Sequence, residues 1–346
     1  MKALLLSKYK QLELADLPEP TVGPGEVLVR VAACGICGSD VHGYDGSSGR
    51  RIPPVVMGHE AAGEIAALGA GVSGLRVGQR VTFDSTVSCG DCAYCRRGEI
   101  NLCEARQVLG VSCGEYRRAG AFAEYIAVPA HIVYALPDNL TFPEAAMLEA
   151  VAVALHAVAL TNDVESSTAL VVGAGMIGLL LLQVLRAAQA SSIIVVDVDT
   201  SRLDLAKRLG ADLTLTAGPG LAQKIQQATS GHGVDVALEA VGRNETVRTA
   251  IESVRKGGTV TLVGNISPEV SLPLQKVVTR QIRLQGSCAS AGEYPQAIEL
   301  MARGEINAKP MITAVAPLAE GPQWFERLYA KEPNLLKVVL TPGAAR

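Results

Sequence analysis

The sequence predicts an α/β protein of two domains, in which a β-rich domain comes first and a doubly wound parallel sheet follows. About the first 145 residues are rich in glycine and proline, and short strand-like runs lie between turns. From residue 167 onward, apolar runs of strand length alternate with longer amphipathic segments, which predicts parallel strands joined by helices. The length of 346 residues agrees with two domains, because one domain commonly takes about 100–200 residues.

The individual elements can be placed on this frame. In the first part, strands are expected at residues 26–33, 63–67, 80–83 and 122–128. A helix is expected to begin at Thr141, because proline and glutamate follow in its first turn. In the second part, strands are expected at 169–172, 193–196, 213–216, 234–238 and 259–263, and helices at 176–189, 202–209 and 246–254. Residues 292–346 are expected to hold two helical stretches and a closing strand at 337–340.

Charge and hydropathy argue against two classes of partner. The formal net charge is −3 and no block of lysine or arginine occurs, so nothing supports nucleic-acid binding. The longest apolar stretches, 145–160 and 176–185, are interrupted or shorter than the roughly 20 residues that span a bilayer. The amino terminus reads as a first strand rather than a signal peptide. We therefore expect a soluble, cytoplasmic protein without a membrane or nucleic-acid partner.

A glycine pattern typical of dinucleotide binding follows the first strand of the second part. Gly173-Ala174-Gly175-Met176-Ile177-Gly178 has the form GxGxxG and opens an apolar helix, whose free N–H groups can bind phosphate. Alone, the pattern could mark only a tight strand-to-helix turn. However, Asp197 ends the next strand, where a carboxylate can accept both adenosine ribose hydroxyls and repel a 2′-phosphate. The sequence therefore predicts NAD rather than NADP, with Arg202 either covering that ribose or lying solvated in a first helical turn.

The nicotinamide end of the cofactor is expected at the loops after the fourth and fifth strands, because ligands bind at the carboxyl edge of open α/β sheets. The backbone groups expected there belong to Val241, Gly242, Val263 and Gly264. Cys288 lies where the chain leaves the sheet and could be a further contact or a small core residue, without a catalytic role.

Four of the eight cysteines lie close together in the sequence. Cys89, Cys92, Cys95 and Cys103 have two, two and seven residues between them. Four thiolates in a glycine-containing loop can enclose a tetrahedral zinc completely, which is the form of a structural site. Disulfides are disfavoured in a large cytosolic chain, and an iron–sulfur cluster is disfavoured because nothing else indicates electron transfer. The sequence therefore predicts a structural zinc.

A second group of metal-binding residue types has an open form. Cys37 begins the run Cys37-Gly38-Ser39-Asp40-Val41-His42, and His59-Glu60 follows about twenty residues later. A thiolate, an imidazole and one carboxylate leave a fourth zinc position open to water or substrate, as in catalytic sites. Each residue alone would more often be an inert core thiol or an ordinary buried histidine. Together, beside a dinucleotide domain, they are predicted to be ligands.

The motifs and their order along the chain resemble those of the zinc-containing medium-chain dehydrogenases, and the resemblance covers essentially the whole chain. Glu149 stands where liver-type alcohol dehydrogenases have a cysteine, so the chain is most similar to the polyol branch, which includes sorbitol, galactitol-1-phosphate and threonine dehydrogenases. The resemblance implies a GroES-like catalytic domain at 1–149 and 290–346, with the four-cysteine lobe at 89–103. It implies a Rossmann NAD-binding domain at 150–289.

The resemblance also implies the ligands of the catalytic zinc, which would be Cys37, His59 and either Glu60 or Glu149. Glu60 is favoured in the resting state, and either the other glutamate would orient the zinc-bound water or the two would exchange. The branch usually has proline where this chain has Ala150, which leaves the role of Glu149 open.

The expected reaction is hydride transfer from an alcohol carbon to NAD. With zinc as a Lewis acid, the substrate hydroxyl would lose its proton near neutral pH. Ser39 would take that proton and His42 would pass it to solvent, unless His42 is only a surface histidine. Asp40 is expected to fix this turn by hydrogen bonding.

The identity of the alcohol stays open at this point. A polyol or sugar alcohol is favoured, although the Arg-Tyr pair of sorbitol dehydrogenases is not visible in residues 286–290. The alternatives are a threonine-type amino-acid alcohol or a simple secondary alcohol, with a zinc-independent quinone reductase or a non-catalytic relative as a remote one. Arg50, Arg51 or Arg117 could bind a phosphorylated polyol, but each is more readily explained as a solvated loop residue. Relatives are homodimers or homotetramers, and residues 281–286 are the expected pairing edge.

Overall fold

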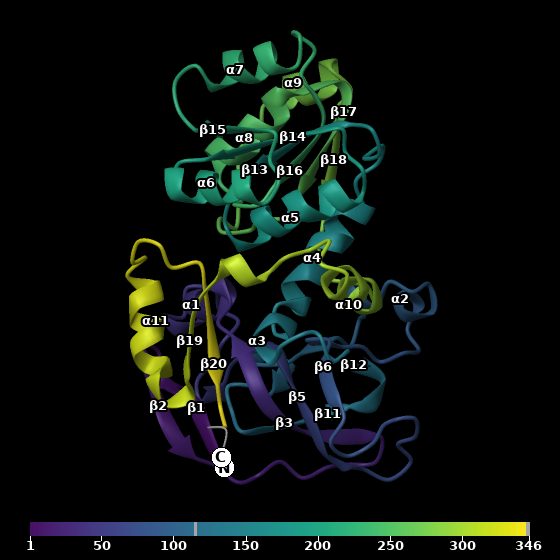
Figure 1. The fold of residues 1–346 in the computed structure, drawn as a ribbon, viewed down its shortest axis with the longest axis vertical. Coiled ribbons are helices and arrows are strands. Elements are labelled where there is room, and N and C mark those ends of the chain that lie inside the picture. The colour runs from purple at the N-terminus through teal and green to yellow at the C-terminus, as the bar shows by residue number, and fades with distance from the viewer. Residues whose placement is uncertain (114–115, 344–346) are drawn as a thin grey trace. The chain divides into compact units, whose positions relative to one another are not determined.

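The computed structural model describes residues 1–113 and 116–343, and it describes only the backbone of Cys113, Tyr116 and Arg117 (Figure 1). The chain forms two compact units. The first contains Met1–Glu149, Tyr294–Ala302 and Ala308–Arg346, and the second contains Ala150–Glu293 and Arg303–Asn307. The sequence places the whole of 290–346 in the first domain, whereas residues 290–293 and 303–307 belong to the second unit. The helix that contains the first boundary is α4 (Leu148–Ala159).

The first unit is built on an antiparallel sheet with the strand order β12-β6-β5-β3-β20-β19, in which β11 also pairs with β3 and only β19 and β20 run parallel. These strands are β3 (Glu26–Gly35), β5 (Glu60–Leu68), β6 (Arg80–Phe83), β11 (Tyr125–Pro129), β12 (Val133–Ala135), β19 (Ile312–Pro317) and β20 (Lys337–Thr341). The predicted strand at 122–128 therefore begins later than expected, and β19 was not predicted.

Smaller elements surround this sheet. A second sheet has the order β2-β1-β4, and two further sheets of two strands each pair β7 with β8 and β9 with β10. Their strands are β1 (Lys2–Lys8), β2 (Gln11–Asp16), β4 (Val55–Val56), β7 (Thr86–Val87), β8 (Gln107–Val108), β9 (Val111–Cys113) and β10 (Tyr116–Arg118). The helices of this unit are α1 (Gly38–Tyr44), α2 (Ala93–Arg96), α3 (Phe142–Ala145), α10 (Tyr294–Ala302) and α11 (Gly321–Tyr329). As expected, Thr141 caps the start of α3 by accepting the N–H of Glu144.

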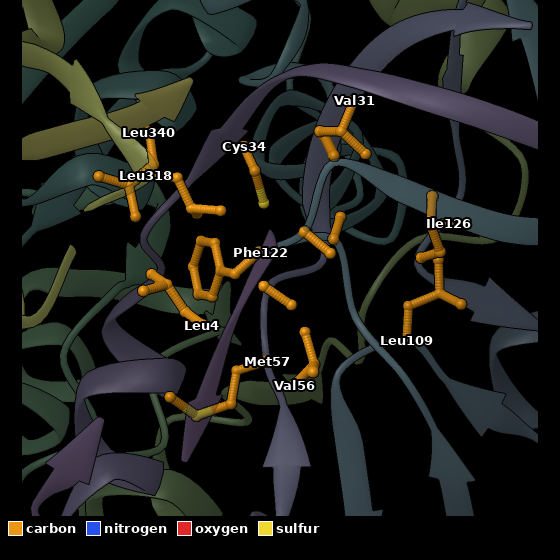
Figure 2. Close-up of a cluster of buried hydrophobic side chains, with 14 of the residues drawn as sticks. Leu4, Val31, Cys34, Val56, Met57, Leu109, Phe122, Ile126, Leu318 and Leu340 are labelled. Carbon is orange, nitrogen blue, oxygen red and sulfur yellow. The ribbon is translucent and has the colours of Figure 1, made fainter. Parts of the chain in front are cut away.

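The core of the first unit lies between these sheets. Figure 2 shows Leu4, Cys34 and Phe122 in this core, where each side chain is essentially inaccessible to solvent. The Phe122 ring meets the Phe325 ring edge to face, with centroids 5.7 Å apart, so α11 closes the core. Full burial of one such side chain stabilises a fold by about 1.5–3 kcal/mol. The cluster therefore holds β3 and β5, which carry the candidate site, in fixed register.

The second unit is a six-stranded parallel sheet with the order β15-β14-β13-β16-β17-β18, which is the doubly wound arrangement that the sequence predicts. The strands are β13 (Thr168–Val172), β14 (Ser192–Asp197), β15 (Leu213–Thr216), β16 (Val234–Glu239), β17 (Val254–Leu262) and β18 (Arg283–Gly286). The helices are α5 (Met176–Ala187), α6 (Thr200–Arg208), α7 (Leu221–Ala228), α8 (Asn244–Ser253) and α9 (Leu274–Thr279). The sequence did not predict α7, α9 or the bounds of β18.

Register brings the functional loops of this sheet to one edge. Val172, the last residue of β13, pairs with Val196 on one side and with Glu239 on the other. The loops that follow β13, β14 and β16 therefore emerge together at the carboxyl edge, where the strand order reverses direction.

One stretch of helix satisfies the length and composition of a membrane span. Phe142–Ala159, which contains α3 and α4, has a mean hydropathy of 1.4, but 67% of it is buried inside the protein. A core helix meets the same criteria, so the stretch is weak evidence for a membrane.

Candidate active site and metal centres

Cys37 lies at the amino-terminal end of α1, where the chain turns sharply after β3. Its backbone is extended, and its N–H donates to Oδ2 of Asp40 at 3.2 Å. Asp40 is completely buried, so this bond is shielded from water. As expected from the sequence, Asp40 fixes the turn, and it thereby fixes the position of the Cys37 thiol.

Pairing between β3 and β5 brings His59 and Glu60 close to Cys37. Gly35, the last residue of β3, stands opposite Glu60, the first residue of β5. Cys37 follows two residues after Gly35, and His59 directly precedes β5. One ligand atom each from Cys37, His59 and Glu60 therefore lies within 4.8 Å of the others.

The imidazole of His59 is oriented by a buried carboxylate. Its Nδ1 lies 3.4 Å from Oδ1 of Asp40, and both side chains are more than nine-tenths buried. Burial disfavours the charged imidazole, but the negative charge of Asp40 outweighs this effect and raises the pKa of His59 well above its ordinary value. Histidines that bind metals commonly turn their other ring nitrogen toward such a carboxylate. The arrangement thus leaves Nε2 of His59 for a metal.

Glu60 is paired with a lysine that lies outside the predicted ligand groups. Nζ of Lys337, on β20, donates to Oε2 of Glu60 at 2.5 Å and to the carbonyl of Ile36 at 3.2 Å. Burial disfavours the charged lysine, but Glu60 outweighs it and raises the pKa of Lys337. Gly35 leaves room for this pair, because a Cβ there would lie 2.4 Å from Oε2 of Glu60. A charged residue in the otherwise apolar segment LKVVL was the available signal.

Glu149 lies in the first turn of α4, beside this group but outside its three closest members. Its Oε1 accepts the hydroxyl of Ser85 at 3.2 Å. Burial raises the pKa of Glu149. The charge of His59 lowers this pKa, and the charge of Glu60 raises it. The grouping therefore favours Glu60 over Glu149 as the carboxylate nearest Cys37 and His59.

The two residues predicted to move a proton lie on the exposed part of α1. Ser39 and His42 are both exposed and three positions apart, so they are neighbours on the helix surface. Oγ of Ser39 accepts a hydrogen bond from Nη2 of Arg51 at 3.1 Å. Arg51 is only 3% exposed and also pairs with Asp40. Its interpretation as a solvated loop residue is therefore wrong, because two acceptors hold its guanidinium inside the protein.

The four clustered cysteines converge as the spacing predicts. One sulfur each from Cys89, Cys92, Cys95 and Cys103 lies within 4.8 Å of the others, and all four thiols are free. Cys92 also caps α2 by accepting the N–H of Cys95. Backbone N–H groups, that of Cys95 first, lower the pKa of Cys92 to about 6. The pKa values of Cys89 and Cys95 are raised instead, by a hydrogen bond with Asp91 and by burial respectively, so the case for a metal here rests on the convergence of the four sulfurs.

The glycine run opens α5 after β13. Gly173 has a φ of +99°, which favours glycine, and a Cβ on Gly178 would lie 1.7 Å from the carbonyl oxygen of Gly173. At Gly175 a Cβ would meet open space, so this backbone is accessible to a ligand. The first and third glycines are thus required by the turn itself, and the second leaves the approach open.

Asp197 connects the glycine run with the next loop. Its Oδ2 accepts the N–H of Ala174 at 2.6 Å, and its Oδ1 accepts the N–H of Asp199 at 2.9 Å. Arg202 lies 3.6 Å from the carboxylate of Asp199, so the position of its guanidinium has a local explanation within α6.

The loops after β16 and β17 pack closely. The buried carboxylate of Glu239 accepts the N–H groups of Val241 and Gly242. A Cβ on Gly264 would lie 2.2 Å from the nitrogen of Val241, so only glycine fits. Val263 donates its N–H to the carbonyl of Glu239. Glu239 therefore positions the residues expected to meet the nicotinamide, a role that its place at a strand end could have indicated.

Comparison with known proteins identifies the class that this fold and these sites define. Residues 23–138 match the alcohol dehydrogenase GroES-like domain, and residues 177–303 match the zinc-binding dehydrogenase domain. The chain belongs to the zinc-binding alcohol dehydrogenase family, which confirms the predicted fold class and the resemblance.

Particular relatives place it more closely. It is 35% identical to sorbitol dehydrogenase of Bacillus subtilis over 99% of this chain and 98% of that protein. It is 36% identical to D-arabitol-phosphate dehydrogenase of Enterococcus avium over 96% and 94% of the two chains. A solved alcohol dehydrogenase of Escherichia coli CFT073 complexed with NADH has a TM-score of 0.91, 31% identity and 99% coverage of both chains.

Proposed function

We propose that this enzyme oxidises a secondary alcohol of a polyol or sugar alcohol to the ketone and passes the hydride to NAD. The observation that carries the proposal is the convergence of Cys37, His59 and Glu60 within 4.8 Å, with Glu149 beside them. The similarity to sorbitol and arabitol-phosphate dehydrogenases supports a polyol as the substrate class.

Cys37, His59 and Glu60 would hold the catalytic zinc, and their thiolate, imidazole and carboxylate are donors that Zn²⁺ takes. A zinc ion held there polarises the substrate hydroxyl and lowers its pKa toward neutrality. Lys337 already engages one oxygen of Glu60, so the other oxygen is the one left for the metal. Glu149 would orient water or substrate at the open position.

The proton of the alcohol would leave through α1. Oγ of Ser39 would accept it, and the exposed ring of His42 would release it to solvent. Asp40 would hold the His59 ring and the Cys37 turn unchanged during this transfer, since it contacts both.

The second unit would hold NAD. The backbone of Gly173, Gly175, Met176, Ile177 and Gly178 would receive the pyrophosphate at the start of α5, where helix N–H groups are free. Asp197 would accept the adenosine ribose hydroxyls, which supports NAD over NADP. The nicotinamide, which accepts the hydride when bound, would lie against the loops of Val241, Gly242, Val263 and Gly264.

The four-cysteine lobe would hold a second zinc with no open position, so its role would be structural. Few buried apolar side chains support this loop, and metal ligation would supply its stability.

The oligomeric state of the chain and its location in the cell are also inferred. β18 is an edge strand, and Leu274 and Val278 on the adjacent α9 are strongly exposed. We propose a cytoplasmic homodimer or homotetramer in which the edges at 281–286 pair.

A substrate screen tests the function directly. Zinc-loaded protein is given NAD or NADP with sugar alcohols, their phosphates, threonine and simple secondary alcohols, with and without a chelator. We expect NADH formation with polyols, its loss on chelation, and none with the Cys37→Ala variant. The exposed Ser73→Ala variant should keep the wild-type rate. Formation of NADH that survives chelation, or exclusive use of threonine, would overturn the proposal.

A further inference from the structure

Arg51 stands out because a loop arginine is buried with its charge inside the first unit. It lies between α1 and β4, only 3% exposed, while its neighbour Arg50 is exposed. A buried guanidinium is costly unless acceptors pair with it. The acceptors that pair with Arg51 therefore indicate its role.

One nitrogen of Arg51 joins two functional groups. Nη2 donates to Oγ of Ser39 at 3.1 Å and to Oδ1 of Asp40 at 3.0 Å. Asp40 in turn lies 3.4 Å from Nδ1 of His59 and accepts the N–H of Cys37. A single guanidinium thus links the hydroxyl proposed to take the proton with the carboxylate that holds two proposed zinc ligands.

The backbone provides a dedicated space for the Arg51 stem. A Cβ on Gly43 would lie 2.5 Å from Cγ and 2.9 Å from Cβ of Arg51. These atoms are near the backbone of Arg51 and cannot swing away freely. Gly43, in the last turn of α1, is therefore the position that lets this arginine reach Ser39.

We propose that Arg51 is a positioning residue of the dehydrogenase reaction and acts through Ser39. A hydroxyl has one proton to donate and two lone pairs. Nη2 of Arg51 occupies one lone pair, so the other faces the substrate hydroxyl and the Ser39 proton points toward the onward path. Without Arg51 the exposed Ser39 side chain is free to change rotamer. This inference rests on the proposed function.

A double-mutant cycle tests the inference. Arg51→Lys keeps a cation beside Asp40, so it should fold, but it cannot reproduce the planar donor geometry. We expect kcat to fall about tenfold with the KM for NAD unchanged, a part of the roughly 10²–10⁴-fold that a proton-transferring group supplies. In the Ser39→Ala background the same change should alter kcat less than about twofold, because the group through which Arg51 acts is gone. Arg76→Met, an exposed arginine of the same unit, is the matched control.

Gly43→Ala provides a second route that changes no functional group. It should displace the Arg51 stem and lower kcat about as much as Arg51→Lys, with the zinc content unchanged by metal analysis. If Arg51→Lys or Gly43→Ala lowers kcat by the same factor with and without Ser39, or leaves it at the wild-type value, the inference is overturned while the proposed function stands. A wild-type protein that reduces no NAD with any alcohol would instead overturn the proposed function, and the inference with it.

Discussion

Nζ of Lys337 lies 2.5 Å from Oε2 of Glu60, and the side chains are only 3% and 2% exposed. The sheet brings the two residues together, because the end of β3 pairs with β20 on one side and with the start of β5 on the other. The carboxyl-terminal segment thus supplies the cation that balances a proposed metal ligand near the amino terminus. Removing one member of such a pair leaves an uncompensated buried charge.

Lys337→Met should lower the free energy of unfolding by about 3–5 kcal/mol, because Glu60 would remain buried without its partner. Denaturant titration of the metal-free protein measures this change. The double variant Lys337→Met with Glu60→Gln should recover much of the loss, and exposed Lys8→Met should change little. An equal loss in the single and double variants would contradict the role of the pair.

Cys103→Ser should lower the zinc content from two ions per chain to one and lower the unfolding temperature. The physical reason is that a closed site needs all four thiolates, and this loop has few apolar contacts of its own. Metal analysis and thermal unfolding measure the two effects. Cys288→Ser, an exposed cysteine outside the cluster, should keep both ions, and equal losses in the two variants would contradict a four-cysteine site.

The features that depend on neighbouring residues could be predicted from the sequence. The glycine run, the acid at Asp197 and the four-cysteine spacing depend on neighbours along the chain, and apolar periodicity located the five strands β13–β17. The partners of the site could not be predicted in this way. Lys337 reaches Glu60 across 277 positions, through a strand pairing that no local pattern encodes.

Errors in the sequence prediction have equally physical causes. The sequence favours a solvated Arg51, because polarity in a loop usually means exposure, and the space beside Gly43 exists only in the folded chain. Helices α7 and α9 have only eight and six residues, too few for a clear helical period. Residues 290–293 and 303–307 group with the second unit through contacts in three dimensions, whereas the family resemblance implies that all of 290–346 belongs to the first domain.

Asp235→Asn should destabilise the protein at neutral pH and have little effect in acid. Oδ2 of Asp235 accepts the N–H of Thr168 at 2.8 Å, and Oδ1 accepts Nε of Arg255 at 2.6 Å. Burial alone would raise the pKa of Asp235, but Arg255 and Thr168 outweigh it and lower the pKa below 3.8. Because the folded-state pKa is depressed, the stabilisation is present above the unfolded value of about 3.9 and is lost as the pH falls through the folded value.

Urea unfolding of wild type and Asp235→Asn between pH 3 and pH 7 measures this effect. We expect a difference of about 1 kcal/mol at pH 7 that shrinks below pH 4. Asp204→Asn, an exposed aspartate of the same unit, is the control. A difference that stays constant over this range would show that the charge of Asp235 does not stabilise the sheet.

Asp197→Asn should raise the KM for NAD by about ten- to a hundredfold and reduce discrimination against NADP. A hydrogen bond to a charged group contributes about 1.5–3 kcal/mol, and asparagine keeps the shape while losing the charge that repels a 2′-phosphate. Initial rates with both cofactors measure the change. Asp204→Asn should leave both KM values unaltered, and an unchanged preference in Asp197→Asn would place cofactor selection elsewhere.

Ser39→Ala should reduce turnover by about 10²–10⁴-fold, because the alcohol proton would lose its first acceptor. The metal ligands do not include Ser39, so both zinc ions should remain, and NAD should bind with unchanged affinity. Turnover, metal analysis and NAD titration measure these three quantities on one preparation. The exposed Ser73→Ala variant of the same unit is the control for a lost hydroxyl. Near-wild-type turnover in Ser39→Ala would remove the relay, and loss of zinc together with turnover would show that the hydroxyl supports the metal site instead.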